Sequence, residues 1–72
     1  RMEEFMFLGL RMMEGVSMEK FEQYFGKTYM EVYGKVQKRM EGKRFLINDN
    51  GYVKLTEFGI DLSNYVMSEF LF

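Results

Sequence analysis

The residue types that most often do chemistry are scarce in this sequence. It contains no cysteine and no histidine, so the commonest metal ligands and the commonest general base are both absent. We therefore expect no catalytic residue, no zinc site and no iron–sulfur cluster within this chain. Any axial haem ligand would have to be methionine or tyrosine. The eight methionines, however, recur at helical spacing, which is more typical of flexible core side chains.

A few polar side chains remain as candidates for contact with another domain. Asp61, Asn64 and Ser68 recur at i, i+3 and i+7, so they line one face of a helix. This face either lies in solvent or uses Asp61 and Asn64 to hydrogen-bond across a domain interface. Near the start of the chain, Arg11 offers a forked donor that could clamp a carboxylate, and Glu14 lies three residues further on.

Helices must position these side chains, and glycines mark where the helices end, because the chain has no proline. The spacing of apolar residues predicts a first helix over Glu3–Met13, with Gly15 as a left-handed cap. A second helix is predicted over Met18–Phe25, with Ser17 as its N-cap.

The third predicted helix begins after Thr28 and ends at Gly42. Thr28 and Glu31 have the spacing of a capping box, in which each side chain accepts a hydrogen bond from the other residue's backbone. One apolar stripe follows the helical period. It consists of Tyr29, Val32, Tyr33, Val36 and Met40.

Two short β-type segments follow, over Phe45–Asn48 and Tyr52–Leu55, and they flank Asp49-Asn50-Gly51. Asn-Gly favours a tight hairpin because both residues accept positive φ. Thr56 is then expected to cap a last helix that runs to the end of the chain. Three helices, a two-stranded wing and a C-terminal helix predict a mainly α (α+β), winged-helix-like fold, as one domain over residues 1–72.

Two of the predicted helices carry more apolar surface than a small core needs. All but one of the large apolar residues of the first helix fill an arc roughly 200° wide, whereas a surface helix needs only about 100°. Phe7 is the exception and falls on the opposite side, among Glu3, Glu4, Arg11 and Glu14. The last helix has a second apolar stripe of Ile60, Met67 and Leu71. Either the first helix is central to the core, or both helices cover a partner, such as another domain or a second copy of the fragment.

Nucleic acid is a less favoured partner. The whole chain has a net charge of −1, although six basic and two acidic side chains give residues 27–44 a local charge of +4. Lys35 and Lys38 could contact phosphates as in a winged-helix DNA-binding module of a transcription regulator. Glu31, however, could pair with Lys35, and Asp49 at the wing tip would repel a phosphate. No apolar segment reaches the length of about 18 residues that crossing a membrane requires.

An ordered set of motifs resembles the C-terminal domain of the oxygen-independent coproporphyrinogen III oxidase family. The motifs are Met6-Phe-Leu-Gly-Leu-Arg-Met-Met-Glu-Gly-Val16, Phe21 to Gly26, Leu55-Thr-Glu-Phe-Gly-Ile-Asp-Leu-Ser-Asn64 and Glu69-Phe-Leu-Phe72. The Gly-Leu-Arg and Gly-x-Asp-x-Ser-Asn segments look most like the branch described as haem chaperones. The Leu-Thr-x-x-Gly motif alone is weak evidence for this family, because many winged-helix domains contain it.

The resemblance implies a cytoplasmic radical S-adenosylmethionine protein of haem biosynthesis or haem delivery, from which this chain is an excised part. Its upstream catalytic barrel would bind S-adenosylmethionine and hold a [4Fe–4S] cluster through Cys-x3-Cys-x2-Cys, with haem as a further ligand in the chaperone branch. None of that cysteine motif is present here. The role that the resemblance implies for four motif residues is to orient this domain against the barrel. These residues are Arg11, Glu14, Asp61 and Asn64. Oxidase and haem chaperone both remain open for the parent.

Overall fold

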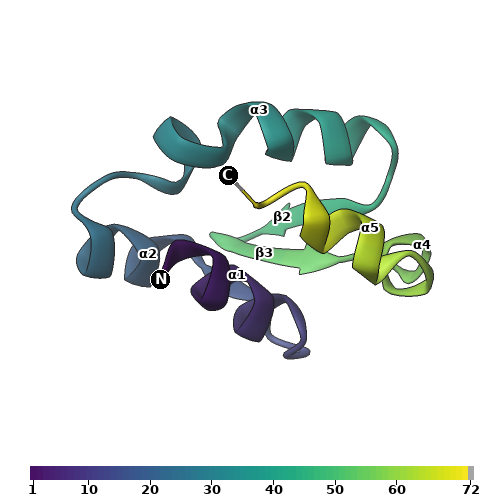
Figure 1. The fold of residues 1–72 in the computed structure, drawn as a ribbon, viewed down its shortest axis with the longest axis horizontal. Coiled ribbons are helices and arrows are strands. Elements are labelled where there is room, and N and C mark those ends of the chain that lie inside the picture. The colour runs from purple at the N-terminus through teal and green to yellow at the C-terminus, as the bar shows by residue number, and fades with distance from the viewer. Residues whose placement is uncertain (72) are drawn as a thin grey trace.

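Five helices surround a small antiparallel sheet in a computed structural model that describes residues 1–71 (Figure 1). In chain order the elements are α1 (Met2–Leu10), β1 (Val16–Ser17), α2 (Met18–Phe25), α3 (Tyr29–Gly42), β2 (Leu46–Asp49), β3 (Tyr52–Leu55), α4 (Glu57–Asp61) and α5 (Ser63–Ser68). The mainly helical α+β class and the order of three helices, a hairpin and C-terminal helical structure are confirmed. The finer winged-helix assignment stays a prediction.

The sheet has the order β1-β3-β2, and both of its pairings are antiparallel. The predicted hairpin is confirmed, since Asn50 and Gly51 have φ of 53° and 82° between β2 and β3. The strand β1 was not predicted. It contributes Val16 opposite Val53, and it is too short to show any alternation in the sequence.

The predicted N-caps of three helices are all present. The Ser17 hydroxyl accepts a hydrogen bond from the Lys20 amide at 3.1 Å. Thr28 and Glu31 form the predicted capping box, because the Glu31 carboxylate accepts from the Thr28 amide at 2.8 Å. The Thr56 hydroxyl likewise accepts from the Gly59 amide at 3.0 Å and opens α4. These local hydrogen bonds fix where the helices begin.

The first helix is shorter than predicted and ends at Leu10 rather than Met13. Leu10 is the last buried residue of α1, and the chain then turns so that Val16 can pair with β3. Gly15 was predicted to cap this helix, and that prediction is wrong: Gly15 lies within the turn at φ +88°, and the C-cap is Arg11. A Cβ at Gly15 would collide with the backbone carbonyl of Val53, so glycine allows the turn to approach the sheet closely.

The last predicted helix is also wrong as a single element, because it breaks at Leu62 into α4 and α5. Leu62 has φ −117° and ψ 36°, which lie outside helical values. The α5 helix ends at Ser68, and Phe72, where the predicted helix and the fourth motif end, lies outside the described residues. The break lets the chain fold back so that Phe70 enters the core.

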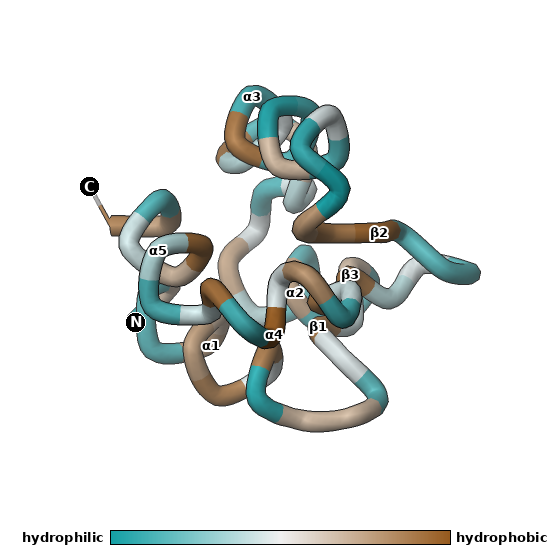
Figure 2. Tube along the Cα trace, turned by 90° about the vertical axis from the view of Figure 1, so that its right-hand side faces the viewer, coloured by the Kyte–Doolittle hydropathy of each residue, from teal (hydrophilic) through white to brown (hydrophobic). Residues whose placement is uncertain are grey.

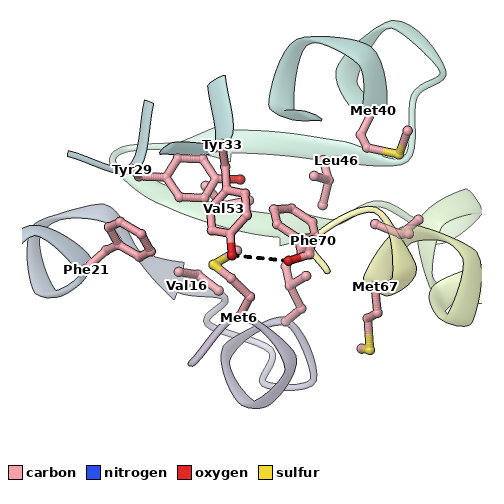
Figure 3. Packing of buried hydrophobic residues seen from close by; sticks show 12 residues of the cluster. Met6, Val16, Phe21, Tyr29, Tyr33, Met40, Leu46, Val53, Met67 and Phe70 are labelled. Atoms are coloured by element: carbon pink, nitrogen blue, oxygen red, sulfur yellow. Dashed lines mark hydrogen bonds between the residues drawn. The ribbon is translucent and has the colours of Figure 1, made fainter. Parts of the chain in front are cut away.

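The core joins α1, α2, α3 and the chain after α5 (Figure 3). Phe21 contacts Tyr29 edge-to-face, with ring centroids 5.7 Å apart, and the Tyr33 hydroxyl donates to the Phe70 carbonyl at 3.2 Å. The predicted stripe of α3 does face inward, as its members are buried or partly buried. Gln37 is buried as well, and its side-chain oxygen accepts from the Tyr29 hydroxyl at 2.7 Å.

Candidate interdomain docking surface

Exposed apolar side chains gather on two neighbouring parts of the molecule, the turn between α1 and β1 and the α4–α5 region. Met12 and Met13 in the turn are 63% and 97% exposed, and Ile60 in α4 is 61% exposed. Figure 2 is seen from the side on which α4 lies, and there the α1–β1 turn forms the lower edge of the molecule. Exposed apolar area of this kind on a small domain is typical of an interface.

An open groove of ≈ 440 Å³ lies between these two parts and is called the turn groove here. Its apolar lining residues are Leu10, Met12, Met13, Leu55, Ile60 and Met67, and its polar lining residues are Arg11, Lys54, Ser63 and Asn64. Leu10 and Met67 are buried, so they form the floor, whereas Met13 and Ile60 stand exposed at the walls.

The turn groove brings together two of the five residues that the sequence indicated as interface candidates. Arg11 and Asn64 are 53 positions apart in the chain, yet both line the groove. Glu14 is exposed and lines a neighbouring hollow of ≈ 360 Å³ together with Leu8 and Tyr52. Asp61 is exposed at the end of α4, outside the residues that line either hollow.

Phe7 is not the free side chain that the helical pattern suggested. It is partly buried and packs against the core. The reason lies on the same face of α1, where Glu3 precedes Phe7 by one turn. The Glu3 carboxylate lies close enough to Tyr33 to contribute to its raised pKa, so this face of α1 points toward α3. Phe7 therefore stays an interface candidate only through its remaining exposed edge.

The second apolar stripe of the last helix is divided by the break at Leu62. Ile60 and Leu71 are exposed, as predicted, at 61% and 57%. Met67 was expected on the same exposed stripe, but it is buried, with only 8% of its surface exposed. Residues seven apart share a face only on a continuous helix, so the break sends Ile60 outward and Met67 inward.

The polar groups of the turn groove differ in whether they already have partners. Lys54 binds the Asp49 carboxylate at 3.3 Å. Within residues 1–71 the Arg11 guanidinium and the Asn64 amide take part in no hydrogen bond or ion pair. An exposed guanidinium without a partner is suited to a planar carboxylate from another molecule or domain.

The sequence pattern did not single out Met12 and Met13 as interface residues. Both were assigned to the first helix as part of its broad apolar arc, because the helical period continues to Met13. Gly15 indicated that the helix ends nearby, but it did not indicate at which residue before Gly15 the helix ends. Among residues 1–71 no helix is long and apolar enough to cross a membrane, and no group of three or more acidic side chains is placed to hold a metal.

Comparison with known proteins supports the family that the sequence motifs indicated. The sequence model of the HemN C-terminal domain matches residues 1–62 of the 72-residue chain. This chain belongs to the HemN C-terminal domain family. It is also 38% identical over 71 residues to a protein named heme chaperone HemW from Lactococcus lactis subsp. lactis (strain IL1403), and 37% identical over 71 residues to heme chaperone HemW from Bacillus subtilis (strain 168).

Each of these alignments covers 99% of this chain but 19% of the relative. The HemN C-terminal domain described here thus spans about a fifth of the length of the curated relatives it matches. No solved structure shows a significant match.

The family-like motifs of this HemN C-terminal domain correspond to close contacts in the structure. In Leu-Thr-x-x-Gly, Thr56 caps α4 and also donates its hydroxyl to the Arg44 carbonyl, while a Cβ at Gly59 would collide with the Phe45 carbonyl. In Gly-Leu-Arg, Leu10 is buried and Arg11 reaches the turn groove. The motifs therefore seat α1 and α4 against the sheet and form the groove between them.

Proposed function

We propose that this chain is the accessory C-terminal domain of a longer radical S-adenosylmethionine protein that handles haem, and that it packs against the upstream catalytic barrel. The observation that carries this proposal is the match of nearly the whole chain to a fifth of two proteins named heme chaperone. The exposed apolar side chains of the α1–β1 turn and of α4 support it, because they give the domain a surface for such packing.

The chemistry in this proposal belongs to the rest of the parent. With no cysteine or histidine, this chain offers no thiolate for a [4Fe–4S] cluster and no imidazole for haem. The cluster, S-adenosylmethionine and haem are assigned to the upstream part, in a cytoplasmic parent where thiolates stay reduced. We favour haem delivery over oxidation of coproporphyrinogen, because both similar relatives carry the chaperone name.

The role of this domain is then to position the barrel and to cover part of it. Arg11 and Asn64, which have no partner side chain within residues 1–71, would bond to the barrel across the turn groove. Glu14 and Asp61 are exposed nearby and would contribute at the rim, together with the exposed edge of Phe7. In the isolated fragment the same apolar surface would favour a weak dimer.

A cleavable parent tests this proposal. A specific protease site is placed before Arg1 in the full-length protein, and the cleaved sample is analysed by size-exclusion chromatography and by haem transfer to an apo-haem protein. We expect the two parts to co-elute after cleavage and haem transfer to continue. Arg11→Ala should weaken the association and slow the transfer. Immediate separation of the wild-type parts, with transfer unchanged, would overturn the proposal.

A further inference from the structure

The turn groove combines an apolar lining with one cation, Arg11, that has no partner within residues 1–71. Resting on the function proposed above, we infer that it receives one apolar segment of the upstream polypeptide, and that a carboxylate of this segment pairs with Arg11. This groove is then the contact that holds the domain to the upstream part, and its occupant is an apolar segment that carries a carboxylate.

The walls of the groove require an apolar occupant. Met13 is 97% exposed and Ile60 is 61% exposed, and both line the groove together with the buried residues Leu10 and Met67. Unbranched methionine side chains adapt to irregular partners, so Met12 and Met13 are suited to pack around an inserted side chain. Burial of these three exposed apolar residues would supply the main driving force for docking.

The charges of the groove specify an acidic partner group. Lys54 is already paired with Asp49, so its charge is largely compensated. Arg11 has no acidic partner within residues 1–71, and it lines the same groove as Met12 and Met13. A carboxylate would bind both arms of the guanidinium. Asn64, which also lines the groove, can accept from and donate to the backbone of an extended segment.

The upstream polypeptide is the occupant best placed to reach the groove. The relatives are about five times as long as this chain, so a large partner is attached in cis. It joins at Arg1, and the nine residues of α1 span only about 14 Å from there to Leu10. A segment tethered at that distance has an effective concentration on the order of millimolar.

A second copy of the chain fits less well. The residues that line the turn groove include two cations, Arg11 and Lys54, and no carboxylate, so a symmetric pairing of two such grooves would offer Arg11 no acidic partner. Arg11, which has no acidic partner among the described residues 1–71, favours a segment that carries a carboxylate. The upstream polypeptide is therefore the proposed occupant, and binding of a second copy would be a contrary result of the experiments below.

The first experiment uses the cleavable full-length parent and measures the dissociation constant between the cleaved parts. Arg11→Glu and Ile60→Asp alter the groove, while Lys35→Glu and Met30→Asp make the same types of change at exposed positions on α3. We expect each groove variant to weaken association by about tenfold or more, as loss of a buried ion pair or apolar contact does. The α3 variants should stay within about twofold. Thermal melting of each variant checks that the domain is folded.

The second experiment identifies the occupant. A photo-crosslinking residue replaces Met13 in the intact parent, and the crosslinked peptide is found by mass spectrometry. We expect an apolar upstream peptide with an aspartate or glutamate, and replacement of that acid by lysine should restore association of Arg11→Glu.

The outcomes separate the two proposals. Crosslinks to a second copy, or groove variants that bind as well as the wild type, would overturn the groove assignment while leaving the docked domain in place. Wild-type parts that separate at once would instead overturn the proposed function.

Discussion

The hydroxyl of Tyr33 donates a hydrogen bond to the backbone carbonyl of Phe70 at 3.2 Å, and this contact fastens the end of the chain to α3. Both residues are buried. We therefore expect Tyr33→Phe to lower the free energy of unfolding by about 1–3 kcal/mol, because a buried carbonyl loses its donor. Urea denaturation of the 72-residue chain measures this. Tyr24→Phe is the matched control, since Tyr24 is 68% exposed, and equal effects of the two changes would contradict the prediction.

The same tyrosine predicts how stability depends on alkaline pH. Burial raises the pKa of Tyr33 from 10.0 to about 12, and the Glu3 carboxylate adds to the effect. Burial also raises the pKa of Tyr29, with contributions from Tyr33 and Glu41. Because the folded state holds these protons more tightly than the unfolded state, the stabilisation is complete below pH 10 and is lost as the pH rises from 10 toward 12.

Urea midpoints measured at intervals across this range should therefore fall steadily above pH 10. The decline should be shallower in Tyr33→Phe, which has one fewer proton to lose, and unchanged in Tyr24→Phe. A midpoint that stays constant up to pH 12 in the wild type would show that these hydroxyls do not titrate with unfolding.

Local backbone chemistry made much of this fold predictable. The N-caps at Ser17, Thr28 and Thr56 and the hairpin at Asn50-Gly51 are each decided by a few neighbouring residues, and all four are present. The early end of α1 was not predictable in this way. It depends on the pairing of β1 with β3, which joins residues 37 positions apart and leaves no periodic pattern.

The candidate site was predictable only in part for the same reason. The motifs pointed to Arg11 and Asn64, and the turn groove unites them. The orientation of Met13 depends on where α1 ends, and that of Met67 depends on where the last predicted helix breaks. If the helical period is continued past those points, it predicts the wrong side of the molecule for both side chains. Such breaks are set by tertiary packing rather than by helix propensity.

Loss of the side chain should lower the stability of the isolated chain clearly at Phe7 and only slightly at Ile60. Helical spacing alone predicted that Phe7→Ser costs little, but Phe7 packs against the core. We now expect Phe7→Ser to cost the isolated chain about 1–2 kcal/mol, as partial burial of an aromatic ring implies. Ile60→Ser should stay within about 0.5 kcal/mol, because Ile60 is 61% exposed. Denaturant melts of both variants test this. If Phe7→Ser lowers the free energy of unfolding by less than Ile60→Ser does, Phe7 is not part of the core.

Duplex DNA should bind this domain no better than it binds a generic weakly charged protein. The local positive charge near α3 is partly compensated, because Arg39 pairs with Glu69. Asp49 at the hairpin binds Lys54, which places a carboxylate where a wing would meet the phosphates. Fluorescence titrations with random duplexes at physiological salt should give no sub-micromolar affinity. A salt-dependent affinity below about 1 µM, reduced by Lys35→Glu, would instead favour the DNA-binding module, since non-specific binding lies at about 10⁻⁴–10⁻⁶ M.

Gly59 and Gly42 allow a test of whether the Leu-Thr-x-x-Gly motif is a packing device. Both glycines are helical, and alanine raises helix propensity at either position by up to about 1 kcal/mol. A Cβ at Gly59 would collide with the Phe45 carbonyl, which cannot withdraw without weakening its 3.0 Å hydrogen bond from the Thr56 amide. A Cβ at Gly42 meets no atom within 4 Å. We therefore expect Gly59→Ala to destabilise the chain by about 1–3 kcal/mol, and Gly42→Ala to stabilise it by about 0.5–1 kcal/mol. Urea denaturation measures both, and stabilisation by Gly59→Ala would show that α4 can move away from the sheet freely.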